Sequence, residues 1–442
     1  MRTPIVDFVR RYAEQNALRL HMPGHKGLPL LGAEALDITE IEGADSLYEA
    51  SGIIQESEEN ASALFGCDTF YSTEGSSQCI RAMLYLALLH ARQSGKDPLV
   101  IAGRNAHKTF LSAAALLDLE IEWLYPREGA SYLSCDIDLC RLESLLAHKA
   151  PAVVYITSPD YLGNVADTPK IAALCHRHGT LLAVDNAHGA YLKFLPASQH
   201  PIDLGADICC DSAHKTLPAL TGGAYLHIAK SAPALFSAQA KNALALFGST
   251  SPSYLLLQSL DLTNAYIADG YREKLCAFTD RVHTLKENLA AHGYTLFGNE
   301  PLKITIHTKP YGYGGKEFSA ILEEKKIVCE FSDNDFAVMM LTPEIGSDLD
   351  RLGSALLSIE RKNAVVEQPP ACKPCERVLS VREAVFSASE TVPARQSVGR
   401  ILAAATVGCP PAVPIVICGE RIDDHAVKCF EYYGIETCTV VK

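Results

Sequence analysis

Short apolar runs alternate with amphipathic segments through the middle of the chain, from Phe70 to about Ile228. The short runs predict strands, and the segments between them carry apolar residues at helical spacing. Nearly continuous apolar strands separated by helices indicate an α/β fold with a largely parallel sheet covered on both faces. The predicted strands are 69–73, 98–102, 120–124, 152–156, 180–184 and 206–210, with a turn and a further strand at 221–227. The predicted helices are 78–91, 108–117, 137–147 and 169–178.

The flanking segments predict additional units. An amphipathic helix at 3–12 and a helix at 56–65 precede the sheet, and one long helix at 259–292 follows it. Strands at 302–306, 328–331 and 337–341 with helices at 316–324 and 348–361 then predict a small α+β unit, and a Pro-rich linker follows at 367–370. We therefore expect an N-terminal arm at 1–30, a large domain at 31–270, a small α+β domain at 271–365 and a C-terminal domain at 371–442.

One uncharged stretch, 401–418, approaches the length of a membrane span. Pro410, Pro411 and Pro414 remove backbone donors inside it, which a helix exposed to lipid would not tolerate. We expect a helix or strand, then a Pro-rich loop, then a strand at 415–417. The sequence therefore predicts a protein without a membrane span.

Net charge and cysteine content limit which partners and which cellular compartment the sequence predicts. The net charge is −13, which argues against a nucleic-acid partner and suits a cationic substrate. The count of 15 cysteines is odd, and the charged first residues lack the apolar core of an export signal. These features predict a reduced, cytoplasmic protein. Cys372 and Cys375 have the spacing of a metal-binding pair, but no second pair is nearby, so we expect no metal site.

The candidate chemistry centres on Lys215, in the segment Asp211-Ser212-Ala213-His214-Lys215 that directly follows a predicted strand. A lysine becomes a good nucleophile toward an aldehyde when burial or nearby cations lower its pKa. Ser212 and His214 could then hold a phosphate group. The alternative is an ordinary lysine in a surface loop.

Two segments upstream favour a lysine that binds an aldehyde cofactor over a lysine in a surface loop. The predicted strand at 180–184 runs directly into Asp185, and a buried carboxylate needs a cation such as a protonated pyridine nitrogen. Gly75, Ser76 and Ser77 precede an apolar helix, whose N-terminus offers backbone N–H groups to a phosphate. Ordinary helix capping by serine is the alternative.

The candidate residues share one position relative to the predicted sheet. The phosphate turn, His107, Tyr161, Asp185 and Lys215 all come just after a predicted strand or on the turn beyond one. Ligands of parallel α/β sheets bind beyond the carboxyl ends of the strands. The pattern therefore predicts a single site at that edge.

Further motifs accompany the lysine segment. They are residues 21–27 (HMPGHKG), 37–41 with 52–54, 104–108, 249–254, 381–384 and parts of 399–420. With them the chain resembles, over nearly its whole length, the fold-type I, pyridoxal-phosphate-dependent ornithine/lysine/arginine decarboxylases of the short bacterial kind. The resemblance implies an aspartate aminotransferase-like large domain with a mostly parallel sheet, a small α+β domain and a small C-terminal domain.

The resemblance also implies roles. Lys215 would be the Schiff-base lysine, Asp185 the partner of the ring nitrogen, His107 a residue stacked on the ring, and His188 a neighbour of the cofactor. The phosphate ligands would be Gly75, Ser76, Ser77, Ser212 and His214, with Thr250 and Ser251 reaching across the interface of a homodimer or larger even-numbered assembly. The acidic residues Glu330 and Asp333 are candidates for binding a basic substrate side chain, and solvated surface carboxylates are the alternative.

The resemblance implies decarboxylation of arginine, lysine or ornithine to the corresponding amine. Departures from the family pattern keep alternatives open: Asn186 stands where the family commonly has Glu, Gly222 and Gly223 replace a more polar pair, and 46–49 replaces a His-containing segment. These alternatives are another pyridoxal-phosphate reaction, such as transamination or C–S lyase chemistry, and a binding or regulatory protein without turnover.

Overall fold

The computed structural model describes residues 1–127, 130–134, 136–371, 373–405 and 412–442, which fold into two compact units. The first unit comprises Met1–Gly95, Thr168–His176 and Leu181–Leu275. The second unit comprises Lys96–Asp167, Arg177–Thr180 and Cys276–Lys442. Each unit therefore combines segments that are distant in the sequence.

The central sheet has seven strands in the order β1-β7-β6-β5-β4-β2-β3. Strand β2 pairs parallel with β3 and with β4, and β5 pairs parallel with β6, whereas β7 pairs antiparallel with β6 and β1. The predicted α/β class with a mostly parallel sheet is confirmed. The strands are β1 (Asp68–Ser72), β2 (Leu99–Gly103), β3 (Glu120–Leu124), β4 (Val153–Thr157), β5 (Leu181–Asp185), β6 (Ile208–Asp211) and β7 (Ala224–Ile228).

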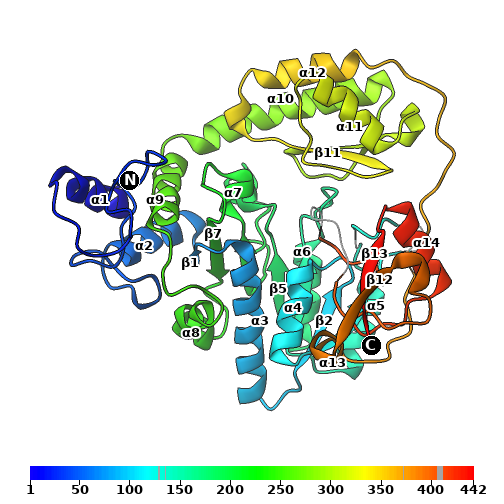
Figure 1. Cartoon of the computed structure of the whole chain (residues 1–442), viewed down its shortest axis with the longest axis horizontal. Coiled ribbons are helices and arrows are strands. Elements are labelled where there is room, and N and C mark those ends of the chain that lie inside the picture. The colour runs from blue at the N-terminus through cyan, green and yellow to red at the C-terminus, as the bar shows by residue number, and fades with distance from the viewer. Residues whose placement is uncertain (128–129, 135, 372, 406–411) are drawn as a thin grey trace. The chain divides into compact units, whose positions relative to one another are not determined.

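Helices account for most of the remaining first unit, and α3 packs against both α8 and the strands of the sheet (Figure 1). These helices are α1 (Pro4–Glu14), α2 (Ile53–Phe65), α3 (Gly75–Gln93), α7 (Ala213–Thr216), α8 (Ala234–Ala245) and α9 (Tyr254–Ala268). Further helices are α4 (Lys108–Leu117), α5 (Leu139–His148), α6 (Thr168–Arg177) and α10 (Tyr271–His292). The buried residues of α3 include Ile80, Met83, Leu84 and Leu88, at the spacing of a helix packed on a core.

A carboxylate from another helix holds the start of α1. The N-cap residue Thr3 makes no side-chain cap, so the first N–H groups of α1 need partners from elsewhere. Asp261 of α9 supplies them, because its Oδ2 accepts from the backbone N–H groups of Ile5 and Val6 at 3.0 and 3.1 Å. Its Oδ1 accepts from Ser57 Oγ at 2.7 Å. This contact joins α1, α2 and α9.

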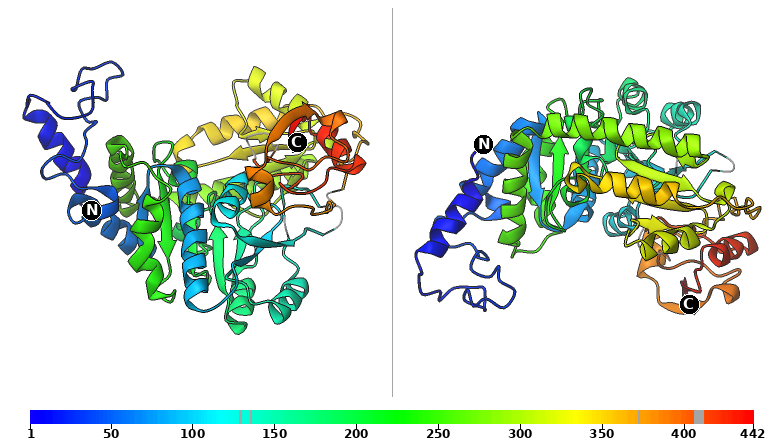
Figure 2. Two further views of the ribbon diagram at one scale, coloured as in Figure 1. Left: turned by 60° about the horizontal axis from the view of Figure 1, so that its bottom comes forward. Right: turned by 90° about the horizontal axis from the view of Figure 1, so that it is seen from above.

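A four-stranded antiparallel sheet organises the small domain, in the order β10-β11-β9-β8. Helices α10, α11 and α12 lie on one face of this sheet (Figures 1 and 2), the layering of an α+β unit. The elements are β8 (Thr295–Phe297), β9 (Lys303–His307), α11 (Gly315–Glu324), β10 (Phe331–Ser332), β11 (Phe336–Met340) and α12 (Asp348–Leu357).

The C-terminal residues form a small unit around their own apolar cluster. Leu402, Ile422, Phe430 and Val440 lie in this cluster with almost no exposure. Its elements are α13 (Val381–Phe386), β12 (Ser389–Pro393), α14 (Asp424–Tyr432) and β13 (Thr437–Val441), with β12 and β13 paired antiparallel. Among the described residues, no helix combines the length and the apolar character needed to cross a membrane.

Several predicted elements differ from the structure. The single helix predicted at 259–292 is two helices, because Gly270 adopts a left-handed φ of +74° that ends α9 before α10 begins. Of the strand predicted at 328–331, only Phe331 lies in a strand, β10, and the helix predicted to reach residue 361 ends at Leu357.

The strand predicted at 415–417 is wrong. Arg104 donates from its two terminal nitrogens to the carbonyl oxygens of Pro414 and Ile415, each at 2.7 Å. Buried carbonyls that a guanidinium already satisfies do not need a strand partner. The residues 415–417 are buried but have no strand pairing. Pro410 and Pro411 lie outside the described residues.

Candidate active site

The N-terminus of α3 has no side-chain cap of the usual kind. Its N-cap residue, Glu74, makes no side-chain bond to the helix; its Oε1 instead accepts from the backbone N–H of Ser249 at 2.9 Å. Gly75 follows with a φ of +69°, and a Cβ built there would meet no heavy atom within 4 Å. The first turn of this long helix thus borders open space, with the backbone N–H groups that bind anions.

Two serine hydroxyl groups meet beside this turn. Ser212 Oγ donates to Ser76 Oγ at 2.8 Å, so the start of α3 and the segment after β6 come together. Ser212 occupies the N-cap position of α7 but makes no side-chain cap there. A serine hydroxyl at an N-cap ordinarily accepts a hydrogen bond from a backbone N–H of the helix. Because the Ser212 hydroxyl bonds to Ser76 instead, it indicates a ligand site and not a helix cap. Ser77 follows in the same turn of α3.

Lys215 lies on α7 directly beside His188. Its Nζ is 3.1 Å from His188 Nε2, a hydrogen-bond distance between a side chain that follows β6 and one that follows β5. His188 is buried, and Lys215 is partly buried. An imidazole at this distance from an amine is within reach to accept a proton from Nζ or donate one to it.

Asp185 is buried at the carboxyl end of β5. Its Oδ1 lies 3.2 Å from the backbone nitrogen of Ala187 and 3.7 Å from Cys210 Sγ, and both groups donate to it. Strands β5 and β6 are parallel, with Asp185 opposite Cys210 in the register. Asp185 and the segment that carries Lys215 therefore emerge at the same edge of the sheet.

His214 is fixed through one ring nitrogen. Its Nδ1 donates to the carbonyl oxygen of Gly223 at 3.0 Å, and because that oxygen only accepts, Nδ1 carries the proton. Burial lowers the pKa of His214, and the nearby Lys215 lowers it further. The Nε2 atom can donate to a phosphate only in the protonated ring, which a nearby dianion favours.

Thr250 and Ser251 are exposed in the loop that precedes α9. This loop is anchored to the phosphate turn through the Ser249–Glu74 hydrogen bond described above. Within it, the backbone N–H of Ser251 donates to Ser249 Oγ at 3.1 Å. The two residues thus stand on a loop tied to the start of α3, with their side chains facing solvent.

His107 belongs to the second unit, where it forms the N-cap of α4. Its Nδ1 accepts from the backbone N–H of Thr109 at 3.1 Å. The residues on either side are bound to the C-terminal domain: Arg104 donates to Pro414 and Ile415, and the Lys108 N–H donates to the Ala412 carbonyl at 2.8 Å. The backbone around His107 is therefore held from the C-terminal domain.

The two acidic candidates have different surroundings in the second unit. Glu330 is exposed and accepts through Oε1 from the hydroxyl of Tyr161 at 2.9 Å. Asp333 is buried in the turn between β10 and β11, where its Oδ1 accepts from the N–H groups of Asp335 and Phe336 at 2.7 and 2.8 Å. Glu330 is accessible to a ligand, whereas Asp333 shapes a turn.

The buried Asp333 carboxyl predicts a pH-dependent stability. Burial raises its pKa from 3.8 to about 6, so the folded state binds the proton more tightly than the unfolded state. Stability should fall as pH rises between these values. Asp333→Asn keeps an acceptor for the two N–H groups and carries no charge. We expect it to raise the free energy of unfolding by roughly 2–3 kcal/mol at pH 8, and to give no gain below pH 4. Urea unfolding at both pH values measures this.

The control for this prediction is Asp350→Asn, at an exposed carboxylate that pairs with Arg281 on the surface. We expect this variant to change stability by less than about 0.5 kcal/mol at either pH. An equal gain from Asp333→Asn at pH 4 and pH 8 would show that the pKa of Asp333 is not raised.

The residues of the first unit fit pyridoxal phosphate. The first unit offers an amine for its aldehyde, a buried carboxylate for its ring nitrogen, and hydroxyl groups at an open helix N-terminus for its phosphate. The mostly parallel sheet with these groups beyond its strand ends defines the fold of fold-type I pyridoxal-phosphate-dependent enzymes.

Solved lysine decarboxylases share the fold. That of Francisella novicida has a TM-score of 0.77 at 17% identity, covering 99% of this chain and 79% of its own. The constitutive one of E. coli has a TM-score of 0.77 at 17% identity, with 100% and 82% covered.

Sequence comparison identifies the family. The model described as "Orn/Lys/Arg decarboxylase, major domain" matches residues 3–293, and "Orn/Lys/Arg decarboxylase, C-terminal domain" matches 363–437. The chain belongs to the Orn/Lys/Arg decarboxylase family and is a pyridoxal-phosphate-dependent amino-acid decarboxylase. It is 29% identical to the arginine decarboxylase of Bacillus subtilis, over 96% of this chain and 92% of that one. It is also 29% identical to that of Halalkalibacterium halodurans, over 96% and 91%.

Sequence reasoning did not assign a role to Asp211, His200 or His227, which form a buried polar cluster behind the lysine segment. An aspartate at the end of an otherwise apolar strand was the available signal, because a buried carboxylate needs donors. The two histidines are distant from it in the sequence, and no pattern linked them. Cys372 lies outside the described residues.

Proposed function

We propose that the protein decarboxylates a basic amino acid, namely arginine, lysine or ornithine, with pyridoxal phosphate bound covalently at Lys215. The observation that carries the proposal is the Lys215–His188 pair at 3.1 Å, placed beyond the end of β6. The Ser212–Ser76 contact next to the open N-terminus of α3 supports it. Relatives named arginine decarboxylases and family membership support the reaction.

The candidate site residues of the first unit have separate roles in this proposal. Ser76, Ser77 and Ser212, with the N–H groups of α3, would hold the phosphate, and His214 would add a donor when protonated. Asp185 would keep the pyridine nitrogen protonated. When bound, pyridoxal phosphate supplies an electron sink for the electrons of the bond to the departing carboxylate. His188 would hold or return the proton at Lys215 Nζ.

We also propose roles for His107 and Glu330, which belong to the second unit. His107 would stack on the cofactor ring, in keeping with the resemblance of residues 104–108. Glu330 would bind the cationic end of the substrate, because it is exposed and its carboxylate is oriented by Tyr161. A protein with a net charge of −13 also attracts such a substrate.

The direct test is product analysis. Purified protein is supplied with pyridoxal phosphate and each of the twenty amino acids, and amines and carbon dioxide are measured by mass spectrometry. We expect agmatine, cadaverine or putrescine with an equal amount of carbon dioxide. A keto acid without carbon dioxide would indicate a transaminase, sulfide release a C–S lyase, and no turnover of any amino acid would contradict the proposal.

Substrate recognition by Glu330 gives a separate prediction. Glu330→Gln keeps the shape but removes the charge that would pair with a guanidinium or ammonium group. A charge-assisted hydrogen bond is worth roughly 1.5–3 kcal/mol, so we expect kcat/KM for the basic substrate to fall by roughly ten- to a hundredfold, mostly through KM. Glu324→Gln, at the end of α11, is the control. An unchanged KM would exclude Glu330 from substrate binding.

The N-terminal arm supports a homodimer or larger even-numbered assembly. Glu34 fixes the arm by accepting from the backbone N–H groups of Leu30, Leu31 and Gly32. Large apolar side chains nevertheless project from this ordered segment into solvent, namely Leu18, Leu20, Met22, Leu28, Leu30 and Leu31, the last being 95% exposed. Exposed apolar clusters of this kind mark association surfaces. We propose that a second copy of the chain covers them.

Sedimentation tests this assembly. We expect a dimer or larger even-numbered species at micromolar concentration. The double variant Leu20→Asp, Leu31→Asp should weaken association at least tenfold, because charges would enter an apolar interface. Leu357→Asp, at an exposed site on α12, serves as the control and should not dissociate the protein. A fully active monomer at micromolar concentration contradicts the proposal.

A further inference from the structure

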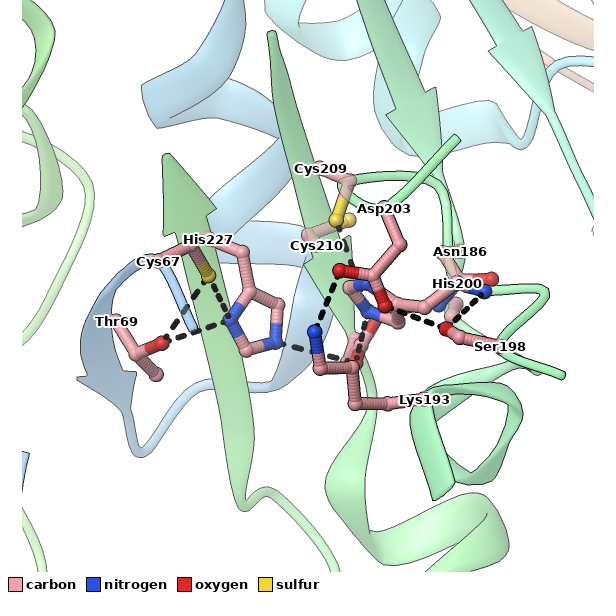
Figure 3. Close-up of polar contacts among 12 residues, drawn as sticks. Cys67, Thr69, Asn186, Lys193, Ser198, His200, Asp203, Cys209, Cys210 and His227 are labelled. Atoms are coloured by element: carbon pink, nitrogen blue, oxygen red, sulfur yellow. Dashed lines mark hydrogen bonds and ion pairs between the residues drawn. The ribbon is translucent and has the colours of Figure 1, made fainter. Parts of the chain in front are cut away.

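A buried carboxylate without a role in the proposed chemistry precedes the lysine segment. Asp211 ends β6 and is fully buried. Its Oδ2 accepts from Nε2 of His200 and Nε2 of His227, each at 3.1 Å, and its Oδ1 accepts from Nδ2 of Asn186 at 2.6 Å. Figure 3 shows Asn186, His200 and His227 within one cluster of polar side chains. The carboxylate is thus held from three separate segments of the chain.

The hydrogen bonds define the charge of this cluster. A carboxylate oxygen only accepts, so both imidazole rings carry a proton on Nε2. Burial lowers the pKa of His227, and its Nδ1, unprotonated in the neutral ring, accepts from Thr69 Oγ1 at 2.9 Å. Burial would raise the pKa of Asp211, but His200 and His227 outweigh it and hold that pKa well below its usual range. Asp211 is therefore a permanent anion within a shell of donors.

Asn186 connects the Asp211 carboxylate to the turn after β5. Its amide nitrogen is bound to Asp211, and its backbone N–H donates to the Cys210 carbonyl at 3.0 Å. A Cβ built on Gly189 would lie only 2.1 Å from Asn186 Oδ1, so the glycine leaves the space that the amide fills. The side chain of Asn186 accordingly has one position, and Asp185 is the residue directly before it.

We propose that Asp211 is a positioning residue for Asp185: through Asn186 it fixes the turn on which the Asp185 carboxylate stands. The inference rests on the proposed function, in which Asp185 meets the ring nitrogen of the cofactor. The residue at position 186 matches this role. An amide donates to the Asp211 anion, whereas a glutamate there would have to take up a proton to do so.

A metal ion is the competing explanation. His200, Cys209 and Asp211 each offer a ligand atom, and these atoms all lie within 4.8 Å of one another. The hydrogen bonds already account for the same atoms, because each ring donates its Nε2 proton to Asp211. Cys209 Sγ is 4.0 Å from His200 Nε2, and burial raises its pKa well above the usual value, which opposes the thiolate that a metal needs.

The experiment compares holoenzyme variants. Asp211→Asn removes the anion, and Asn186→Ala removes the link with a smaller effect on folding. For each protein we would measure kcat, the dissociation constant of pyridoxal phosphate, and the pH midpoint of the visible absorption band. We expect both variants to lower kcat at least tenfold and to shift the pH midpoint by at least half a unit. The dissociation constant should change less than threefold. The double variant should be no worse than the poorer single variant, because both act along one path.

The control is Asp203→Asn, in the same cluster. Asp203 pairs with Lys193 at 2.6 Å and with Ser198, and we expect this variant to leave kcat and the pH midpoint unchanged. Variants that lose only thermal stability, with normal kcat and pH midpoint, would overturn the inference. Stoichiometric zinc in the wild type that is lost in Cys209→Ser would also overturn it. A wild type without a visible band would instead contradict the proposed function itself.

Discussion

Lys215→Ala should abolish both the covalent attachment of pyridoxal phosphate and decarboxylation. We expect wild-type protein to be yellow, and borohydride reduction should link the cofactor to Lys215 alone, as peptide mass spectrometry would reveal. The variant removes both the nucleophile and the proton acceptor next to His188. General acid–base catalysis alone contributes roughly 10²–10⁴-fold, so a rate loss of at least about a thousandfold is expected.

Lys230→Ala is the matched control for this experiment. Lys230 is exposed and pairs with Asp68 at the surface, and such pairs contribute little to stability. This variant should keep the visible band and full turnover. Reductive labelling of any lysine other than Lys215 would show that the site has been assigned to the wrong residue.

Asp185→Asn should bind the cofactor and lose nearly all turnover. An amide can hydrogen-bond to the pyridine nitrogen but cannot stabilise its positive charge, so the ring becomes a weaker electron sink. Electrostatic stabilisation of this kind is worth roughly 3–5 kcal/mol, which corresponds to about a hundred- to several-thousand-fold in rate. Cofactor affinity should fall less, because the phosphate turn and Lys215 remain. The measurement is kcat with cofactor occupancy determined spectroscopically in the same sample.

Asp207→Asn provides the comparison, because it alters a buried carboxylate at the opposite end of the same strands. Asp207 accepts from the backbone N–H of Leu182 at 2.7 Å, at the start of β5. This variant should lose stability but keep its rate per bound cofactor. An Asp185→Asn protein with full occupancy and near-normal turnover would identify Asp185 as structural.

The central sheet could be predicted because its strands are buried on both faces and therefore continuously apolar. Strand β3 and helix α4 have the predicted bounds of 120–124 and 108–117. Strand β12 was not predicted, because its residues are mostly exposed and polar and no apolar alternation marks them. The strand predicted at 415–417 was wrong for a different reason. Its apolar composition correctly indicates burial, but the nearby carbonyl of Pro414 is bound by the side chain of Arg104, 310 residues earlier in the chain, and not by a neighbouring strand.

Part of the site was also accessible from the sequence. Asp185 and the segment of Lys215 follow successive apolar runs, and parallel strands bring such ends to one edge. Ser76 and Ser212 were predicted as phosphate ligands from the family resemblance and helix-terminus physics, and the structure places their hydroxyl groups 2.8 Å apart. The cluster around Asp211 could not be anticipated, because its donors come from segments without a common motif. The hydrogen bond between Tyr161 and Glu330 depends on tertiary packing, which no local pattern encodes.

The attachment of the C-terminal domain around His107 has a genetic consequence. Arg104 is buried, and its charge is satisfied by the carbonyl groups of Pro414 and Ile415; the Lys108 N–H depends on Ala412 in the same way. A nonsense mutation anywhere between codons 371 and 411 would remove all three acceptors while sparing every codon of the large domain. The shortened protein would keep Lys215 and Asp185 but would lose the carbonyl groups that orient Arg104, three residues before His107. We therefore expect a stop codon in this range to lower activity, even though the candidate site residues of the first unit would still be encoded.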